Sequence, residues 1–254
     1  MANSKNTDRK EQEYLHCSWM SLQHEELTEL EHAVAQAKNG LKDEHKLRQL
    51  IQKTVNHFQD YTNNRTLLAR NDVSPFFAPA TCTTLENSVL WIAGCRPSSF
   101  IRFTYALSGM DVESHISDFL EGKRIGGDLG ELTGKQMSMI DELHGKTIRE
   151  ERKLSTKLAS LQEDIVDQPL AGKMKKKGGG DNDDEYENAD EALEEHSQLM
   201  AGVMEEADEL RMKTLKEIVN ILEPVQAVEY LAAAKRIRFC VQQWGKKRDH
   251  EHTD

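Results

Sequence analysis

Apolar residues recur at helical spacing through most of this sequence, and proline and glycine interrupt the pattern at few points. Between Arg9 and Lys38, apolar side chains follow one another at intervals of three to five residues, which places them on one face of a helix. The chain of 254 residues contains only five Pro and 15 Gly, too few turn formers for an all-β fold with many tight turns. The sequence therefore predicts an all-α fold, a single bundle of long and short helices.

Start and stop signals divide this pattern into separate predicted helices. They span residues 9–38, 43–68, 85–93, 97–107, 111–120, 132–166, 188–222 and 224–247. Asn39-Gly40 ends the first helix, Asp43 can cap the second and Thr84 the third. The first two helices should pack antiparallel because their connection is so short.

The stretch from residue 71 to residue 84 breaks the helical pattern. Pro75 and Pro79 each exclude a regular helix, and two phenylalanines lie between them. We therefore predict a loop that buries its own aromatic side chains. The aromatic residues of the chain concentrate from residue 76 to residue 105, and we expect that part to form the centre of the core.

Charge and glycine runs mark the segments that should not fold. Residues 173–185 pass from lysines through glycines to acids with almost no apolar content, so burial cannot offset their ordering entropy. We predict a disordered N-terminus at 1–10 and one helical domain at 11–248 that contains a disordered linker at about 170–187, followed by a polar tail at 249–254. The lysines of the linker could also act as a nuclear-import signal or an anion patch.

Several function classes have no support in the sequence. Nucleophile elbows, phosphate-binding loops and zinc-protease motifs are missing, so we expect no enzyme activity and no catalytic residue. A net charge of -11 argues against wholesale binding to nucleic acid. No secretory signal or membrane span is evident, which predicts a nuclear or cytoplasmic protein that makes no membrane contact.

Cysteine and histidine spacing gives no metal site either. The four cysteines contain no C-x-x-C pair and are expected to stay reduced. His16 stands beside Cys17, and His250 and His252 flank Glu251 at the end of the chain. Each pair could bind a metal or a haem iron, but close pairs arise by chance among ten histidines, and we expect no metal.

Large apolar side chains gather at the start of the first predicted helix. They are Tyr14, Leu15, Trp19, Met20 and Leu22, and they lie close to the polar N-terminus. Burial in the bundle is one interpretation. The other is binding to a partner as a helix in a groove, since Trp, Tyr and Met are enriched at the centres of interfaces.

Six short blocks stand in order along nearly the whole chain, from about residue 11 to residue 248: Trp19–Gln23, Leu85–Asn87, Trp91–Phe100, Ser160–Asp164, Leu222–Ala227 and Trp244–Gly245. Together they resemble the plant delay-of-germination (DOG domain) family. We take as the core of this motif Trp91, Gly94, Arg96, Pro97, Ser98, Pro224 and Trp244. The same domain forms the C-terminal part of TGA-type bZIP transcription factors, but no basic region with a leucine zipper precedes it here.

The resemblance implies a regulator of seed dormancy and abscisic-acid signalling that binds type 2C protein phosphatases. The phosphatase-binding segment of the family corresponds to Tyr14–Gln23, which adds Gln23 to the candidate residues. About two extra residues separate Tyr14 and Leu15 from Trp19 here, which rotates the pair by roughly 200° around a helix. A module that regulates transcription beside DNA-bound factors is the alternative function, and a haem or metal sensor is a third.

The family's haem-binding pattern has two histidines four residues apart in the last helix. Arg238 and Gln242 occupy those positions here, and neither can replace a neutral imidazole as an iron ligand. We therefore expect no cofactor.

Overall fold

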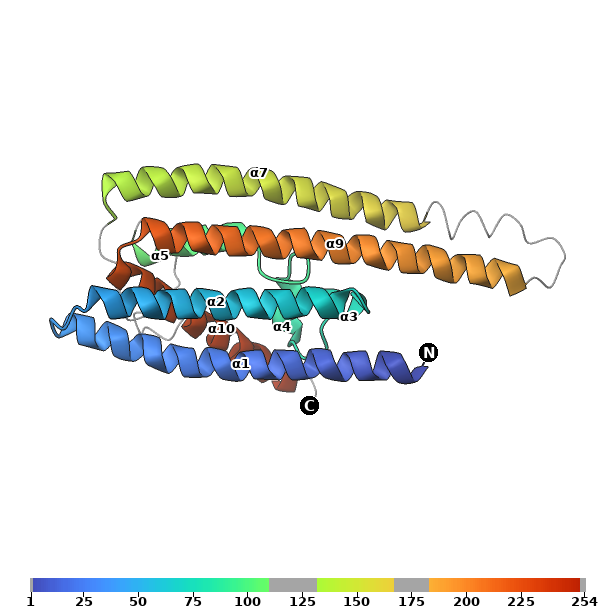
Figure 1. The fold of residues 1–254 in the computed structure, drawn as a ribbon, viewed down its shortest axis with the longest axis horizontal. Coiled ribbons are helices and arrows are strands. Elements are labelled where there is room, and N and C mark those ends of the chain that lie inside the picture. The colour runs from blue at the N-terminus through green and yellow to red at the C-terminus, as the bar shows by residue number, and fades with distance from the viewer. Residues whose placement is uncertain (1, 110–131, 167–182, 252–254) are drawn as a thin grey trace.

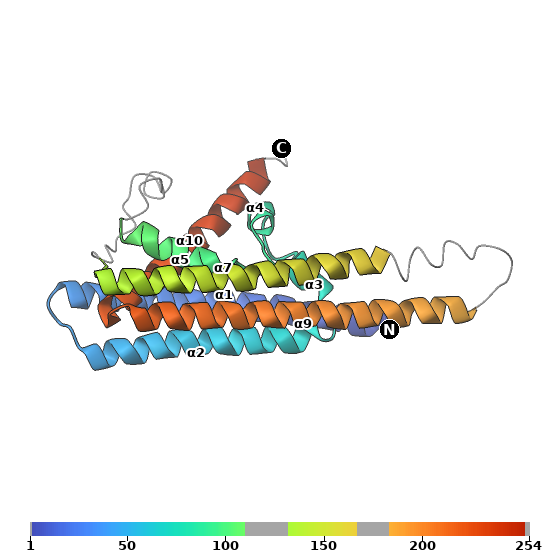
Figure 2. The same ribbon diagram turned by 90° about the horizontal axis from the view of Figure 1, so that it is seen from above.

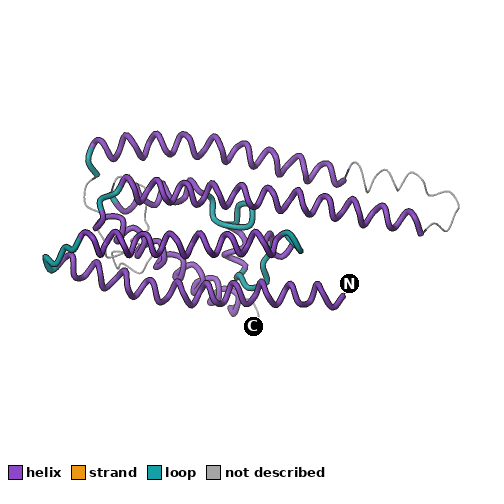
Figure 3. Tube along the Cα trace, in the orientation of Figure 1, coloured by secondary structure: helices purple, strands orange, loops and turns teal. Residues whose placement is uncertain are grey.

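The computed structural model describes residues 2–109, 132–166 and 183–251, and over that part of the chain the fold is all-α, as predicted. The helices are α1 (Ala2–Lys38), α2 (Glu44–Ala69), α3 (Ser74–Phe77), α4 (Thr84–Ser88), α5 (Pro97–Leu107), α7 (Gly134–Ile165), α9 (Asp183–Ile221) and α10 (Pro224–Glu251). Among the described residues, the one extended pairing is an isolated bridge between Trp91 and Gly94. Figure 3 shows how little of the trace lies outside helices.

Four long helices form a layer, and the shorter elements lie on one side of it. In Figure 1, α1, α2, α9 and α7 follow one another across the layer, and α1 and α2 are antiparallel as predicted. Figure 2 shows α10 leaving the layer at an angle, with α4 and α5 on the same side. This arrangement places α10 against both α1 and α2 and leaves α4 beside its C-terminal half.

The main core lies where α10 meets the layer. Its fully buried side chains come from five helices of the bundle and are Leu30, Ile101, Ile140, Ile218, Ala227 and Val228. A smaller cluster lies between α7 and α9 and also contains Ile92. Residues 76–105 therefore contribute to the core without forming its centre, because α9 and α10 supply more of the buried side chains. No described helix is long and apolar enough to cross a membrane.

Local signals placed several helix ends correctly. Asp43 caps α2 by accepting a hydrogen bond from the backbone N–H of Lys46, and Pro97 opens α5. Gly109 adopts a φ of 73°, the left-handed conformation that ends a helix. Thr133 forms a capping box with Gln136 at the start of α7, within one residue of the predicted helix start.

Other predicted boundaries were wrong. The helix expected at 85–93 ends at Ser88, and its cap is Thr83 rather than Thr84. The loop expected at 71–84 contains α3, a single turn that accepts Pro75 in its first positions, where a missing N–H costs nothing.

Three helices extend into segments that were predicted as the disordered N-terminus, the linker and the polar tail. Helix α1 begins at Ala2, inside the predicted disordered N-terminus, and residues 2–8 contain no proline or glycine that would break it. Helix α9 begins at Asp183, inside the predicted linker, and α10 continues to Glu251, inside the predicted tail. The helix expected at 111–120 and most of the linker lie outside the described residues.

Candidate functional site

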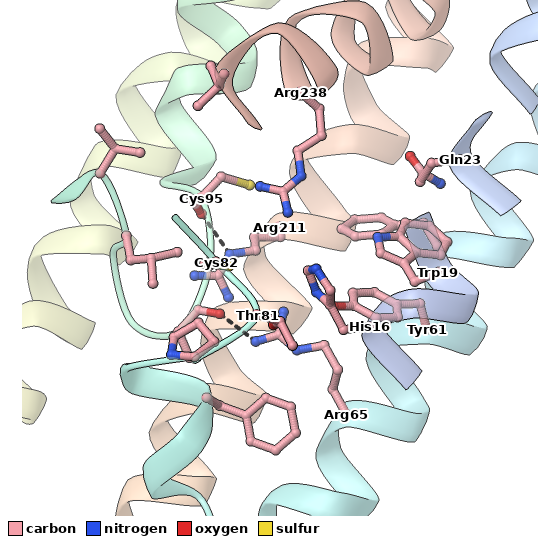
Figure 4. Close-up of a pocket in the computed structure, with 18 of the residues that line it drawn as sticks. His16, Trp19, Gln23, Tyr61, Arg65, Thr81, Cys82, Cys95, Arg211 and Arg238 are labelled. Atoms are coloured by element: carbon pink, nitrogen blue, oxygen red, sulfur yellow. Dashed lines mark hydrogen bonds between the residues drawn. The ribbon is translucent and has the colours of Figure 1, made fainter. Parts of the chain in front are cut away.

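A cavity of about 1170 Å³ opens between α1, α2, α5, α10 and the segment from residue 74 to residue 95 (Figure 4). Each helix presents residues at helical spacing to it. From α2 these are Thr54, Phe58, Tyr61 and Arg65, at intervals of four, three and four residues. His16, Trp19 and Gln23 follow the same spacing on α1. The cavity thus runs along the antiparallel contact of the first two helices.

Aromatic rings form one wall of the cavity. Trp19 stacks on Tyr61 with ring centroids 4.3 Å apart and planes 8° from parallel, and it also contacts Phe58 at 5.9 Å. The ammonium of Lys235 lies 5.9 Å from the Trp19 ring, within cation–π range. Burial raises the pKa of the Tyr61 hydroxyl, so Tyr61 stays uncharged. Trp19 is therefore held by two aromatic rings of α2 and by the ammonium of Lys235.

A buried carboxylate joins three helices behind this wall. Glu26 of α1 is 1% exposed; its Oε2 accepts a hydrogen bond from Lys235 Nζ of α10 at 2.5 Å. Its Oε1 lies 2.8 Å from His57 Nδ1 of α2. Gln23 bonds both Glu26 and Lys235. Burial lowers the pKa of Lys235, and the negative charge of Glu26 opposes that shift.

A second charged pair lies beside His16. Arg238 Nη1 of α10 lies 3.2 Å from Glu86 Oε1, and the Glu86 side chain is 1% exposed. Burial is the main cause that lowers the pKa of the His16 imidazole, and the positive charge of Arg238 adds to it. Cys82 lines the same part of the cavity, where burial raises the pKa of its thiol. The neutral forms of His16 and Cys82 are thus the favoured ones.

The residues from Trp91 to Cys95 form a tight turn instead of the predicted helix. Ile92 and Ala93 have φ values of 43° and 58°, a left-handed conformation that costs free energy for residues with a Cβ. Arg211 of α9 compensates by donating to the carbonyls of Trp91, Ile92 and Cys95 at 2.5–2.8 Å.

A second arginine also donates a hydrogen bond to the turn. Arg65 Nη2 donates to the carbonyl of Ala93 at 2.5 Å, and Asp208 Oδ1 lies between the two guanidinium groups, 2.6 Å from Arg211 and 3.5 Å from Arg65. A Cβ at Gly94 would lie 2.8 Å from Arg211 Cζ, so only glycine fits without displacing the arginine. Figure 4 shows the two arginines near the turn, Arg65 from α2 and Arg211 from α9.

The remaining motif residues fix the elements around the turn. Arg96 and Ser98 both bond Glu151 of α7, and Pro97 between them is buried at the first position of α5. Trp91 Nε1 donates to Ser155 Oγ of α7 at 3.0 Å. Pro224 opens α10.

At the other end of α10, Trp244 is half-buried. The glycine after it packs against Thr83 so closely that a Cβ there would collide with the threonine side chain. The motif core is thus a set of contacts that hold the turn, α4, α5 and α10 together.

The structure separates the predicted partner-binding residues into two groups. Tyr14 is 76% exposed. Leu15, Trp19 and Gln23 line the cavity instead, while Met20 and Leu22 are half-buried. Most of the predicted partner-binding side chains are therefore buried or half-buried in the bundle. Tyr14 is the one among them that is exposed on the surface.

Arg238 and Gln242, at the positions of the family's haem-binding histidines, lie on α10, and Arg238 lines the cavity as the ion partner of Glu86. Over the described ranges, no group of three or more His, Cys, Asp and Glu side chains has the arrangement of a metal site. The expectations about haem and metal stay predictions.

Sequence reasoning missed the charged residues that organise this site. Glu26, Lys235, Asp208 and Arg211 are all less than 7% exposed. One signal was present: each occupies a helical position where the apolar pattern calls for a buried side chain, as Lys235 does four residues after Leu231. A charge at such a position indicates a partner from another helix, because an unpaired buried charge is very costly.

Comparisons with known proteins now add to this geometry. The family model described as "DOG1: Seed dormancy control" matches residues 26–106. Among curated relatives, the chain is 38% identical to "Protein DOG1-like 1" of Arabidopsis thaliana over 100% of its own length and 95% of that protein. It is 27% identical to "Protein RESPONSE TO ABA AND SALT 1" of the same plant, covering 72% of each. "Transcription factor TGA6" matches at 22% over 90% of this chain and 63% of that factor.

Proposed function

This chain belongs to the DOG1 seed dormancy control family, and on that basis we propose that it is a non-enzymatic regulator of dormancy and abscisic-acid responses that acts by binding other proteins. A type 2C protein phosphatase is the proposed partner. The similarity to "Protein RESPONSE TO ABA AND SALT 1" supports the signalling context.

The exposed face of α1 is the observation that carries the proposal. Tyr14, Ser18, Ser21 and Glu25 are all exposed, and their spacing of four, three and four residues places them on one side of the helix. We call these residues the outer face of α1. They lie within or next to the segment that the family uses for phosphatase binding, and a helix face of this length suits a groove on a partner.

The anchor of the proposed contact is Tyr14 and not Trp19. Trp19 stacks on a ring of α2 and contacts the ammonium of Lys235, so these interactions would be lost if it turned outward to a partner. Tyr14 therefore acts as the anchor, and Trp19 keeps α1 in place.

Binding to a purified plant type 2C phosphatase, measured by pull-down and by calorimetry, tests the proposal. The wild-type chain should bind, and Tyr14→Ala together with Ser21→Arg should reduce binding at least tenfold without lowering the unfolding temperature. Leu41→Ala is the matched control, because Leu41 is 69% exposed and lies in the connection that follows the C-terminal end of α1. A wild-type chain that binds no phosphatase would remove the phosphatase from the proposal.

A module that regulates transcription is the second candidate, favoured by the match to TGA6. DNA affinity measured at increasing salt tests it. Direct binding through several phosphates would give a steep loss of affinity with salt, and an absent signal would exclude direct DNA contact.

A further inference from the structure

Ser74 and Pro75 form the one position in the sequence at which a serine or threonine stands directly before a proline. The other four prolines follow Ala, Arg, Gln and Glu. Proline has no backbone N–H and restricts the residue before it, so most protein kinases reject it after the phosphorylated residue, whereas the proline-directed serine kinases select for it. A kinase of that class therefore has a single candidate site in this chain.

The Ser74 hydroxyl is accessible to a kinase. Ser74 is exposed, and its hydroxyl forms no hydrogen bond with any residue that the structure describes, whereas its backbone N–H donates to Asp72 Oδ1 at 3.1 Å. It lies in the connection between α2 and α4, which contains a single helical turn, α3. Little regular structure has to open for this connection to enter the substrate groove of a kinase.

The first turns of α1 lie against this connection. Gln12 Nε2 donates to the carbonyl of Asp72 at 3.0 Å, two residues before Ser74. Arg9 precedes Gln12 by three residues on the same face of α1, and Arg9 and Ser74 both line the cavity. Arg9 is exposed and forms no ion pair with another described residue. Its guanidinium can therefore pair with a new negative charge on Ser74.

The other charges near the connection leave this role to Arg9. Arg65 approaches the connection over the ring of a phenylalanine, but it is 6% exposed and already bonds two partners inside the bundle. Arg70 pairs with a glutamate of α9 at 3.3 Å. The carboxylate of Asp72 lies beside Ser74 and would repel a phosphate there, which directs the phosphate away from the connection and toward α1.

We propose that Ser74 is a phosphorylation site for a proline-directed serine kinase and that Arg9 binds the phosphate. In the transfer, the Ser74 oxygen forms a bond to the γ-phosphorus of ATP as the bond from that phosphorus to the β–γ bridging oxygen breaks. ADP leaves, and the hydroxyl proton passes to the catalytic base of the kinase. The pair of phosphate and guanidinium ties the start of α1 to the segment after α2. This modification goes beyond the proposed phosphatase contact and does not depend on it.

Incubation of the full chain with ATP and a purified mitogen-activated protein kinase, followed by mass spectrometry, tests the site. The wild-type chain should gain one phosphate, on Ser74. Ser74→Ala should gain none, and Pro75→Ala, which keeps the hydroxyl, should react about ten times more slowly. Ser160→Ala removes an exposed serine of α7 that no proline follows and should react like the wild type. The site is wrong if a serine-proline control peptide is phosphorylated while the chain is not, or if Ser74→Ala gains phosphate as the wild type does.

Phosphorus NMR of the phosphorylated chain tests the role of Arg9. A neighbouring cation favours the dianion and lowers the second pKa of a phosphoserine, which is ordinarily about 6. Arg9→Gln should raise this pKa by about 0.5, and Glu13→Gln, which removes a carboxylate that also lines the cavity, should lower it. Lys10→Gln removes the next positive charge of α1, which lies outside the cavity lining, and should change the pKa less than Arg9→Gln does. A phosphate pKa that is the same in the wild type and in Arg9→Gln overturns the pairing.

Discussion

Glu151 Oε1 of α7 accepts a hydrogen bond from the backbone N–H of Ser98 at 2.6 Å, so a side chain of one helix caps the start of another. Its Oε2 accepts from Ser98 Oγ and from Arg96 Nε. The Glu151 side chain is fully buried, whereas half of Arg96 remains in contact with solvent. Arg96, the N-cap residue of α5, makes no side-chain hydrogen bond to the first turn of its helix. The Glu151 carboxylate takes that role by accepting the hydrogen bond of a free backbone N–H there.

Replacing Glu151 with alanine should lower the free energy of unfolding by about 2–4 kcal/mol, because the buried N–H and hydroxyl of Ser98 lose their acceptor. Urea unfolding followed by circular dichroism measures the change. Glu151→Gln, which keeps one oxygen acceptor, should recover part of the loss. Glu150→Ala removes the exposed neighbour and should have no measurable effect. Equal stabilities for Glu151→Ala and wild type would show that the cap contributes nothing.

Two helical glycines should respond in opposite ways to alanine. A Cβ at Gly245 would collide with the Thr83 side chain, which caps α4, so Gly245→Ala should cost about 1–3 kcal/mol by forcing α4 and α10 apart. Gly202 of α9 has open space at that position, and Gly202→Ala should stabilise the protein by about 0.5–1 kcal/mol through helix propensity. Thermal unfolding of both variants checks the prediction, and a loss of stability in both would contradict it.

Local chemistry predicted much of the fold. The cap at Asp43, the proline that opens α5 and the apolar periodicity of the long helices act within a few residues, so the sequence alone reveals them. The turn at Trp91–Cys95 was not predictable in this way. The sequence of this segment favours a continued helix. Arg211, which is distant in the chain, stabilises the turn instead by donating hydrogen bonds to the backbone carbonyls of the turn.

The cavity was hidden for a related reason. The spacing of the apolar residues of α1 predicts which face of the helix points inward, but it cannot distinguish a filled core from an open space. The buried pair of Glu26 and Lys235 joins α1 to α10 next to the cavity, and neither residue can be assigned to the other from the sequence. Tertiary pairing of charges is thus the part of this site that sequence periodicity does not encode.

Arg211→Lys should release the turn. A lysine keeps the positive charge beside Asp208 but cannot donate to the carbonyls of Trp91, Ile92 and Cys95 together, so the cost should be about 3 kcal/mol or more. Hydrogen exchange should show faster exchange at the amides of Trp91 and Gly94, which bond each other across the turn. Arg48→Lys on the exposed face of α2 is the matched control and should leave both measurements unchanged.

His16 should make the protein less stable as the pH falls. Burial and the positive charges of Arg238 and Arg65 lower the pKa of His16 in the folded chain below its ordinary value of 6.5, and Glu86 offsets only part of this effect. As the pH drops through 6.5, the unfolded chain takes up a proton that the folded chain still excludes. Protons then favour the unfolded state, so the free energy of unfolding declines until the pH reaches the lowered pKa of the folded form.

His16→Gln removes this contribution and should flatten the decline in the free energy of unfolding between about pH 7 and pH 5, the range in which histidine titrates. Urea unfolding at several pH values measures the slope for each protein. His45→Gln replaces an exposed histidine beside the start of α2 and should keep the wild-type slope. If His16→Gln and His45→Gln have the same slope as the wild-type chain, then His16 is not held neutral by the cavity.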